Sequence, residues 1–153
     1  MEARLPSRIV CLTEETTETL YRIGEADRIV GISGFTVRPP QARKEKPRVS
    51  AFTSARIDRI LALSPDLVLG FSDLQADIAQ ELIRAGVSVM VFNHRSVNGI
   101  LDMMKTLGAM VGALDSTEAL IGECQANLDR ARRQAPPVRP RVYFEEWDTP
   151  QIS

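Results

Sequence analysis

The chain has 153 residues, an ordinary hydrophobic share of 44% and a formal net charge of −1. This length suits one well-buried core and is too short for two full domains of ordinary size. Because the basic residues are spread along the chain, the sequence does not predict a surface for nucleic acid or anionic lipid.

The first strands and helix are predicted by apolar runs and by the polar residues that follow them. The run at residues 8–12 predicts a buried strand. Thr13, followed by acidic residues, is typical of a helix start, because its hydroxyl can cap free amide groups and acids complement the helix dipole. Gly24 supplies the left-handed stop of this helix. A second strand is expected at residues 28–32.

A long polar stretch at residues 33–55 follows the second strand. It contains Pro39 and Pro40 and predicts a loop with one short extended segment at residues 49–52. Connections of this length inside a compact lobe are more often functional than not. We therefore expect this loop to contribute to a site.

Residues 57–71 carry the clearest pattern in the chain. Apolar residues at helical spacing predict an amphipathic helix over residues 57–63. Pro65 ends it, because proline disfavours helical backbone in the preceding residue and lacks an amide proton. The unbroken apolar run at residues 67–69 then predicts a strand that is covered on both faces, as in a parallel sheet.

Further helices and a further strand continue the alternation. Ser72 and Gln75 form a capping-box pattern, which predicts a helix that ends near Ala85. Residues 87–92 predict another strand, and residues 97–113 another helix. The alternation predicts an α/β fold, a Rossmann-like open parallel sheet with helices on both faces.

The end of the chain predicts a long helix at residues 116–134 and then a strand at residues 141–145. This strand is either the first strand of a second lobe that is missing here, or an edge strand of the existing sheet. The domain prediction follows the first alternative. It assigns residues 1–114 to an amino-terminal α/β ligand-binding lobe, 115–135 to a linker helix and 136–153 to the start of a truncated carboxy-terminal lobe.

The cysteines and the first residues bear on the cellular compartment. Cys11 and Cys124 have no paired ligand spacing, so packed thiols are expected, with a disulfide as the alternative. Residues 1–7 lack the apolar core of a signal peptide, and no run approaches membrane-spanning length. The chain is therefore either cytosolic, or a signal was removed or never included.

An enzyme on a nucleotide-binding lobe is the weaker alternative. The first strand is not followed by a Gly-x-Gly-x-x-Gly pattern, and the sequence has no Walker loop. His94 is the only histidine, so triads of nucleophile and base have few options. His94 could also bind a metal, but no second histidine or cysteine pair accompanies it. We therefore expect neither catalysis nor a resident metal.

Several spaced segments carry a resemblance to a known family. They lie at residues 8–13, 18–20 and 27–32, and more specifically at residues 39–42 and 58–69. The pattern resembles the helical-backbone (class III) solute-binding proteins of ABC importers, which carry vitamin B12 or ferric siderophores, and it is closest to the cobalamin-binding members. The resemblance covers roughly residues 8–153. It implies two α/β lobes joined by a long helix, with the ligand in the cleft between them.

The resemblance implies a non-catalytic substrate-binding component of an ABC importer. Such a protein binds cobalamin or a related metal chelate as cargo, without a cofactor, and delivers it to the membrane permease. Ferric siderophore or haem binding, and a cytosolic cobalamin-binding relative without a transport role, are the alternatives. A periplasmic or extracytoplasmic location is implied, and a cytoplasmic one stays open because no signal peptide is visible. Self-association of two copies could replace the missing lobe.

Loops at the carboxyl ends of parallel strands form the ligand crevice in such sheets, and helix amino termini present free amide groups there. The expected loops are residues 13–16, 33–38, 71–73 and 93–96. The predicted ligand-binding residues are Thr13, Glu14, Phe35, Arg38, Phe52, Phe71, His94 and Trp147.

The resemblance implies roles for Phe52, Phe71, Arg38 and Asp58, and a fifth candidate, Trp147, follows the end of a predicted strand. Phe52 and Phe71 fall where cobalamin binders often place tryptophans, and aromatic rings suit a flat corrin, although core packing is the alternative. Arg38 falls where a pocket tyrosine is common; it could favour a carboxylate or phosphate, or be a solvated loop charge. Trp147 could close over the ligand or pack against the missing lobe. Asp58 occupies the position of a glutamate that pairs with permease arginines, and a plain helix charge is the alternative.

Overall fold

The computed structural model describes residues 4–145, 147–148 and 151–152. The chain divides into two compact units, Met1–Gly122 and Glu123–Ser153, which we describe separately. The long helix α6 (Leu114–Gln134) crosses the boundary between them.

The first unit alternates strands and helices, as the sequence predicts. Its strands are β1 (Ile9–Cys11), β2 (Ile29–Ser33), β3 (Arg48–Ser50), β4 (Leu67–Phe71) and β5 (Val89–Phe92). Its helices before α6 are α1 (Glu14–Arg22), α2 (Ala42–Glu45), α3 (Ile57–Ala62), α4 (Ala76–Arg84) and α5 (Val97–Val111), with 3-10 turns η1 (Ala26–Arg28) and η2 (Asp73–Gln75).

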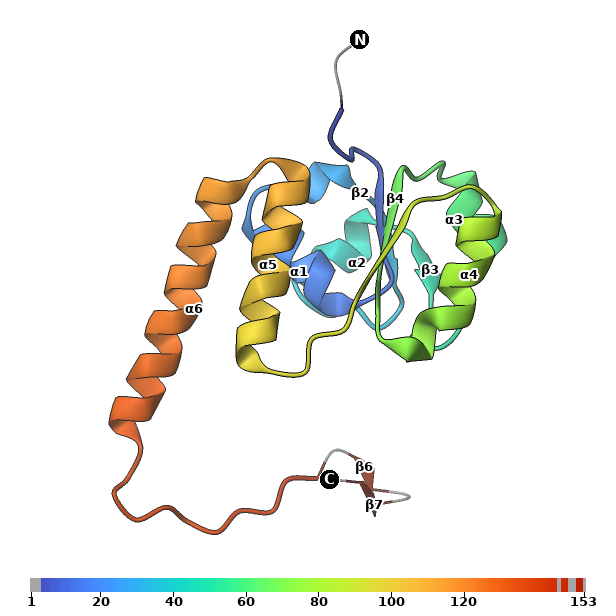
Figure 1. Ribbon diagram of the computed structural model, residues 1–153. Helices are drawn as coiled ribbons and strands as arrows, with labels where there is room; N and C mark the ends of the chain where they lie inside the picture. The colour runs from blue at the N-terminus through green and yellow to red at the C-terminus, as the bar shows by residue number, and fades with distance from the viewer. Residues whose placement is uncertain (1–3, 146, 149–150, 153) are drawn as a thin grey trace. The chain divides into compact units, whose positions relative to one another are not determined.

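The five strands form one parallel sheet in the order β3-β2-β1-β4-β5. Figure 1 shows α1 and α5 on one side of the sheet and α3 and α4 on the other. This confirms the predicted open parallel sheet with helices on both faces. Because all five strands run in the same direction, the loops that follow them lie at one end of the sheet. We call this end the carboxyl edge.

The core explains why the strands are unbroken apolar runs. Ile9, Val10 and Cys11 of β1 are all fully buried, because helices cover both faces of the sheet. A buried cluster on the α3 and α4 side joins strand residues to Ile60 of α3 and Leu82 of α4. Removing one such side chain from water contributes about 1.5–3 kcal/mol.

The long stretch after β2 is more ordered than a loop. It contains the short helix α2, and the Tyr21 hydroxyl of α1 donates a hydrogen bond to Glu45 Oε2 of α2 at 2.7 Å. The extended segment expected at residues 49–52 is confirmed as β3, which lies at residues 48–50 and forms one margin of the sheet.

Both cysteines are free thiols, as expected for packed side chains. Burial raises the pKa of the Cys11 thiol to about 12, although hydrogen bonds with Thr16 and Thr17 oppose the shift. Cys11 is therefore an unreactive core residue. Within the described residues, no helix has both the length and the apolar character needed to cross a membrane.

In the second unit, residues 141–145 form no strand, so the prediction at these positions is wrong. Val142 and Phe144 are 83% and 73% exposed, so nothing among the described residues of this unit covers the apolar alternation there. The edge-strand alternative is also wrong, because the five-stranded sheet does not include these residues. Instead, β6 (Trp147–Asp148) pairs antiparallel with β7 (Gln151–Ile152).

Candidate ligand-binding site

The order of the strands places a topological switch point at the carboxyl ends of β1 and β4. From β1 the chain adds β2 and β3 on one side of the sheet, and it then crosses to add β4 and β5 on the other side. The loops after β1 and β4 consequently diverge, and ligands of open α/β sheets bind at such switch points. Three predicted residues lie at this point: Thr13 and Glu14 after β1, and Phe71 at the end of β4.

Gln75 ties the loops at this switch point together. Its side chain is fully buried. The amide nitrogen Nε2 donates to the carbonyl oxygens of Leu12 at 3.3 Å and Phe52 at 2.9 Å, and Oε1 accepts from the Phe71 amide at 2.9 Å. A Cβ atom at Gly70 would lie 2.9 Å from Gln75 Oε1, so glycine makes room for this side chain. Phe52 and Phe71 therefore lie at the same edge.

This role of Gln75 was not predicted from the sequence. The capping-box prediction is wrong in its partners: Ser72 Oγ accepts from the Leu74 amide at 3.3 Å, while Gln75 bonds to the Phe71 amide and not to that of Ser72. The available signal was helical spacing, because Gln75 lies three and seven residues before the buried Ile78 and Leu82. A glutamine on a buried stripe requires hydrogen-bond partners in the core.

The backbone is strained at the turn between β4 and η2. Ser72 has φ 60° and ψ 174°, a region that residues other than glycine rarely adopt. Its amide donates to the Phe92 carbonyl oxygen at 2.8 Å, which couples the ends of β4 and β5. This conformation turns the chain immediately after Phe71.

Phe71 lies in a cluster of side chains from the loops after β4 and β5. The ring centroids of Phe71 and His94 are 4.7 Å apart, with planes tilted by 43°. Arg95 Cζ lies 4.9 Å from the Phe71 centroid, and Arg95 Nη2 lies 3.8 Å from Asp73 Oδ1. The structure thus brings together the predicted Phe71 and His94 and adds Arg95 and Asp73, which are not among the predicted ligand-binding residues.

Arg38 lies beside the start of α1. Its Nε atom is 3.8 Å from Glu14 Oε1 and 3.4 Å from Glu18 Oε2, although the side chain is 70% exposed. Two carboxylates therefore surround one guanidinium, so these three side chains together carry a net negative charge. The predicted residues Glu14 and Arg38 are in contact.

Thr13 is the residue before α1, but its hydroxyl does not cap the helix as expected. It donates to Glu15 Oε1 at 2.7 Å instead. The Thr13 carbonyl oxygen accepts hydrogen bonds from the hydroxyls of Thr16 and Thr17, each at 3.2 Å. These side-chain bonds leave amide groups at the start of α1 without the predicted cap.

Apolar side chains are exposed along the carboxyl edge. Phe35, in the loop after β2, is 63% exposed, and Phe52 is half-buried. Val37, Leu74 and Val97 are also exposed and follow β2, β4 and β5 respectively. Trp147 belongs to β6 in the second unit, and its side chain lies outside what the structure describes.

Four buried polar atoms at this edge have no hydrogen-bond partner among the described residues. Burying an unpaired polar group costs about 1–3 kcal/mol, so such atoms are uncommon in native cores. They belong to the segments at the ends of β1, β2, β3 and β5, and are Glu14 Oε1, Thr36 Oγ1, Ser50 Oγ and His94 Nδ1. The carboxyl edge thus contains polar atoms that the described residues leave without a partner.

Asp58 lies in the first turn of α3, and its side chain is 68% exposed. The Arg56 guanidinium donates to both of its carboxylate oxygens, at 3.3 and 3.2 Å, and these bonds lower the pKa of Asp58. Because α3 begins after the loop that follows β3, Asp58 is at the carboxyl edge.

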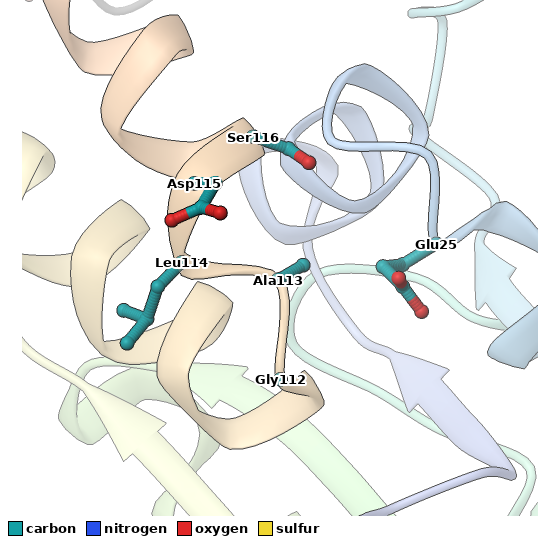
Figure 2. Close-up of a pocket in the computed structure, with 6 residues that line it drawn as sticks. All are labelled: Glu25, Gly112, Ala113, Leu114, Asp115 and Ser116. Atoms are coloured by element: carbon teal, nitrogen blue, oxygen red, sulfur yellow. The ribbon is translucent and has the colours of Figure 1, made fainter.

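A cavity of about 300 Å³ lies elsewhere, where Glu25 faces the turn between α5 and α6. Figure 2 shows this turn on one side of the cavity and Glu25 on the other. Both α1 and α5 begin at the carboxyl edge and end here, so the cavity is at the opposite end of the sheet. It is not the predicted ligand crevice.

No group of three or more potential metal ligands occurs within the described residues.

The chain is similar to known proteins in sequence and in fold. A family profile described as "Periplasmic binding protein" matches residues 9–152. A cobalamin-binding protein of Halobacterium salinarum is 27% identical over 148 residues, which cover 94% of this chain and 40% of that protein. An uncharacterized ABC transporter substrate-binding lipoprotein, YvrC of Bacillus subtilis, is 25% identical over 96% of this chain and 49% of its own length. This chain thus spans about half the length of these relatives.

The fold also matches solved structures. The periplasmic vitamin B12 binding protein BtuF of Vibrio cholerae superposes with a TM-score of 0.82. The match covers 95% of this chain and 58% of that one, at 24% sequence identity. The likeness is one of fold.

Proposed function

We propose, from the premise that the chain belongs to the periplasmic binding protein family, that it is a non-catalytic ligand-binding lobe of an ABC importer. Its cargo is cobalamin or a related metal chelate, which it delivers to the permease. The names of the Halobacterium and Bacillus relatives support the ligand and the transport role respectively. The family description and the word lipoprotein in the name of the Bacillus relative support a location outside the cytoplasm.

One observation carries the choice of ligand: Gln75 holds the Phe52 and Phe71 backbones at the same edge of the sheet. Two aromatic side chains with exposed apolar neighbours suit a broad, flat ligand, because such a ligand gains most from ring contact and apolar burial. A corrin has this shape. Phe35 extends the apolar surface, and Thr13, Glu14, Arg38 and His94 supply polar groups beside it.

Trp147 is proposed as a further ligand contact, and Asp58 has a role outside this surface. Asp58 would contact arginines of the permease, and its exposure at the carboxyl edge supports this role. In that complex, a permease arginine replaces or joins Arg56 at the carboxylate.

The test is calorimetric titration of the chain with cyanocobalamin, haemin and a ferric siderophore in parallel. We expect cyanocobalamin to bind, and Phe52→Ala and Phe71→Ala each to weaken binding about tenfold, which corresponds to about 1.4 kcal/mol of ring contact. Ile83→Ala is the control, because Ile83 is 59% exposed on α4 and outside the site. It should bind like the unmodified chain.

Three outcomes would contradict the proposal. Binding of none of the three ligands would exclude this class of cargo. Binding of haemin or the siderophore alone would favour the alternative cargo over cobalamin. Ester or nucleotide turnover that disappears in His94→Ala would show an enzyme.

For Asp58, we expect Asp58→Ala to bind cyanocobalamin normally and to reduce uptake in a reconstituted transporter.

A further inference from the structure

The cations at the carboxyl edge differ in what surrounds them. Arg38 has two carboxylates within 3.8 Å, those of Glu14 and Glu18. Arg56 donates two hydrogen bonds to Asp58. Arg95 has one carboxylate partner, Asp73, at 3.8 Å, and the Asp73 side chain is 87% exposed. Among the described residues, the Arg95 guanidinium makes no hydrogen bond. Its donors are therefore open to an external acceptor.

Arg95 is also held where a ligand on Phe71 would lie. Its guanidinium carbon is 4.9 Å from the centroid of the Phe71 ring, within the range of a cation–π contact. The His94 ring lies against Phe71 as well, with centroids 4.7 Å apart. A flat ligand that uses Phe71 must either displace the Arg95 side chain or lie beside it. In both cases the guanidinium remains within reach of the margin of the ligand.

The helix that follows Arg95 adds to the positive potential. The helices α1, α3 and α4 also start at this edge, and each has an acid in its first turn: Glu14, Asp58 and Asp77. The 15-residue helix α5 has none. Its Ser96 cap uses a neutral hydroxyl, which accepts from the Gly99 amide at 3.0 Å. The positive end of the α5 dipole is thus not offset by a local carboxylate.

We propose that Arg95 recognises an anionic group, a phosphate or carboxylate, carried beside the flat apolar part of the ligand that lies on Phe71. The planar guanidinium can bind two oxygens of such a group at once. This inference rests on the proposed ligand-binding function and adds a specificity-determining residue to it. It assigns to Arg95 the anion preference that the sequence had suggested for Arg38, whose charge is already offset by carboxylates.

The experiment compares two corrinoids on four forms of the chain. Cyanocobalamin carries a phosphodiester, whereas dicyanocobinamide lacks the nucleotide loop and its phosphate. Calorimetry measures both affinities for the unmodified chain, Arg95→Gln, Arg95→Lys and Arg84→Gln. Arg84 is the matched control, because it is an exposed arginine at the end of α4 that lies away from the carboxyl edge.

We expect Arg95→Gln to lower the affinity for cyanocobalamin about tenfold, which is the size of one charge-assisted contact. The affinity for cobinamide should change by no more than about twofold. Arg95→Lys should give an intermediate loss, because it keeps the charge but not the two-pronged geometry. The loss should shrink at high salt, because the site is exposed. Arg84→Gln should change neither affinity.

If Arg95→Gln lowered the affinity for both corrinoids equally, the proposal would be overturned, because a purely structural role of Arg95 predicts equal losses. No loss for cyanocobalamin would also overturn it, while leaving the proposed function intact. If the unmodified chain binds haemin and no corrinoid, the same comparison with haemin and its dimethyl ester tests carboxylate recognition. Binding of no tetrapyrrole and no siderophore would reject the proposed function itself, and with it the role of Arg95.

Discussion

The Phe71 amide donates a hydrogen bond to Gln75 Oε1 at 2.9 Å, although the two residues belong to different elements, β4 and η2. The other end of the same side chain donates to the carbonyl oxygens of Leu12 and Phe52. One fully buried amide group thereby connects three of the five loops at the carboxyl edge.

We predict that Gln75→Leu destabilises the chain by about 3 kcal/mol, because it leaves one amide and two carbonyl groups without their partner. It should also weaken cyanocobalamin binding, since Phe52 is then no longer held beside Phe71. Urea unfolding followed by circular dichroism measures the first effect, and calorimetry the second. Gln80→Leu, on the exposed side of α4, is the control and should change stability by less than about 0.5 kcal/mol. A Gln75→Leu variant as stable as the unmodified chain would contradict the role assigned to the side chain.

The fold was predictable because the strands are apolar on both faces, as in Ile9, Val10 and Cys11. The positions of Phe71 and His94 were predictable because each follows an apolar run. The contacts of Gln75 were not, because Leu12 lies 63 residues away along the chain. Arg95 was missed for a similar reason: its position over Phe71 depends on the register in which Phe71 pairs with Phe92.

The failed prediction at residues 141–145 has a different cause. Alternating apolar residues indicate a strand only where another layer covers one face, and a pattern in a sequence does not show whether that layer exists. Val142 and Phe144 are exposed. The prediction of a strand therefore failed at residues whose apolar side chains are not packed against other described residues of this unit.

The backbone strain at Ser72 leads to a second prediction. Its φ of 60° and ψ of 174° cost a residue with a side chain about 1–3 kcal/mol, and glycine much less. Ser72→Ala keeps this strain and loses the hydrogen bond from the Leu74 amide, so it should destabilise by about 1–2 kcal/mol. Ser72→Gly loses the same bond but relieves the strain, so it should lie within about 1 kcal/mol of the unmodified chain. Urea midpoints rank the variants, and a glycine variant less stable than the alanine variant would refute the explanation.

Asp66 provides a prediction for pH dependence. Partial burial raises the pKa of its carboxyl, but hydrogen bonds from the Ser7 and Arg8 amides, at 2.8 and 2.9 Å, outweigh this effect and lower the pKa below 3.8. The carboxylate form therefore stabilises the folded chain at pH values above 3.8, and this contribution is lost as the pH falls through the lowered pKa.

We expect Asp66→Asn to lower the free energy of unfolding by about 1 kcal/mol or less at pH 7, because the site is exposed, and to have a smaller effect at about pH 2.5. Urea titrations at both pH values measure the difference. Asp102→Asn, on the exposed side of α5, serves as the control. An Asp66→Asn variant that loses the same stability at both pH values would exclude a charge-dependent role.

Two helical glycines give opposite predictions for alanine substitution. A Cβ atom at Gly108 of α5 would lie 2.0 Å from Thr117 Oγ1 of α6, and Thr117 is fully buried with its hydroxyl bonded to the Ala113 carbonyl oxygen at 2.7 Å. Gly108→Ala must therefore push the two helices apart and should destabilise by about 1–3 kcal/mol. At Gly122 of α6 the same Cβ has no neighbour within 4 Å, so Gly122→Ala should stabilise by about 0.5–1 kcal/mol through helix propensity alone.

Thermal and urea unfolding of the two variants measure these signs directly. Comparing the two variants controls for the intrinsic helix propensity of alanine, because both substitutions gain that propensity and only Gly108→Ala meets the Thr117 side chain. Adding Thr117→Ala to Gly108→Ala should recover part of the loss, because alanine lacks both the Oγ1 atom that lies 2.0 Å from the added Cβ and the methyl group at 2.9 Å. If Gly108→Ala were as stabilising as Gly122→Ala, α5 and α6 could not pack at this close distance.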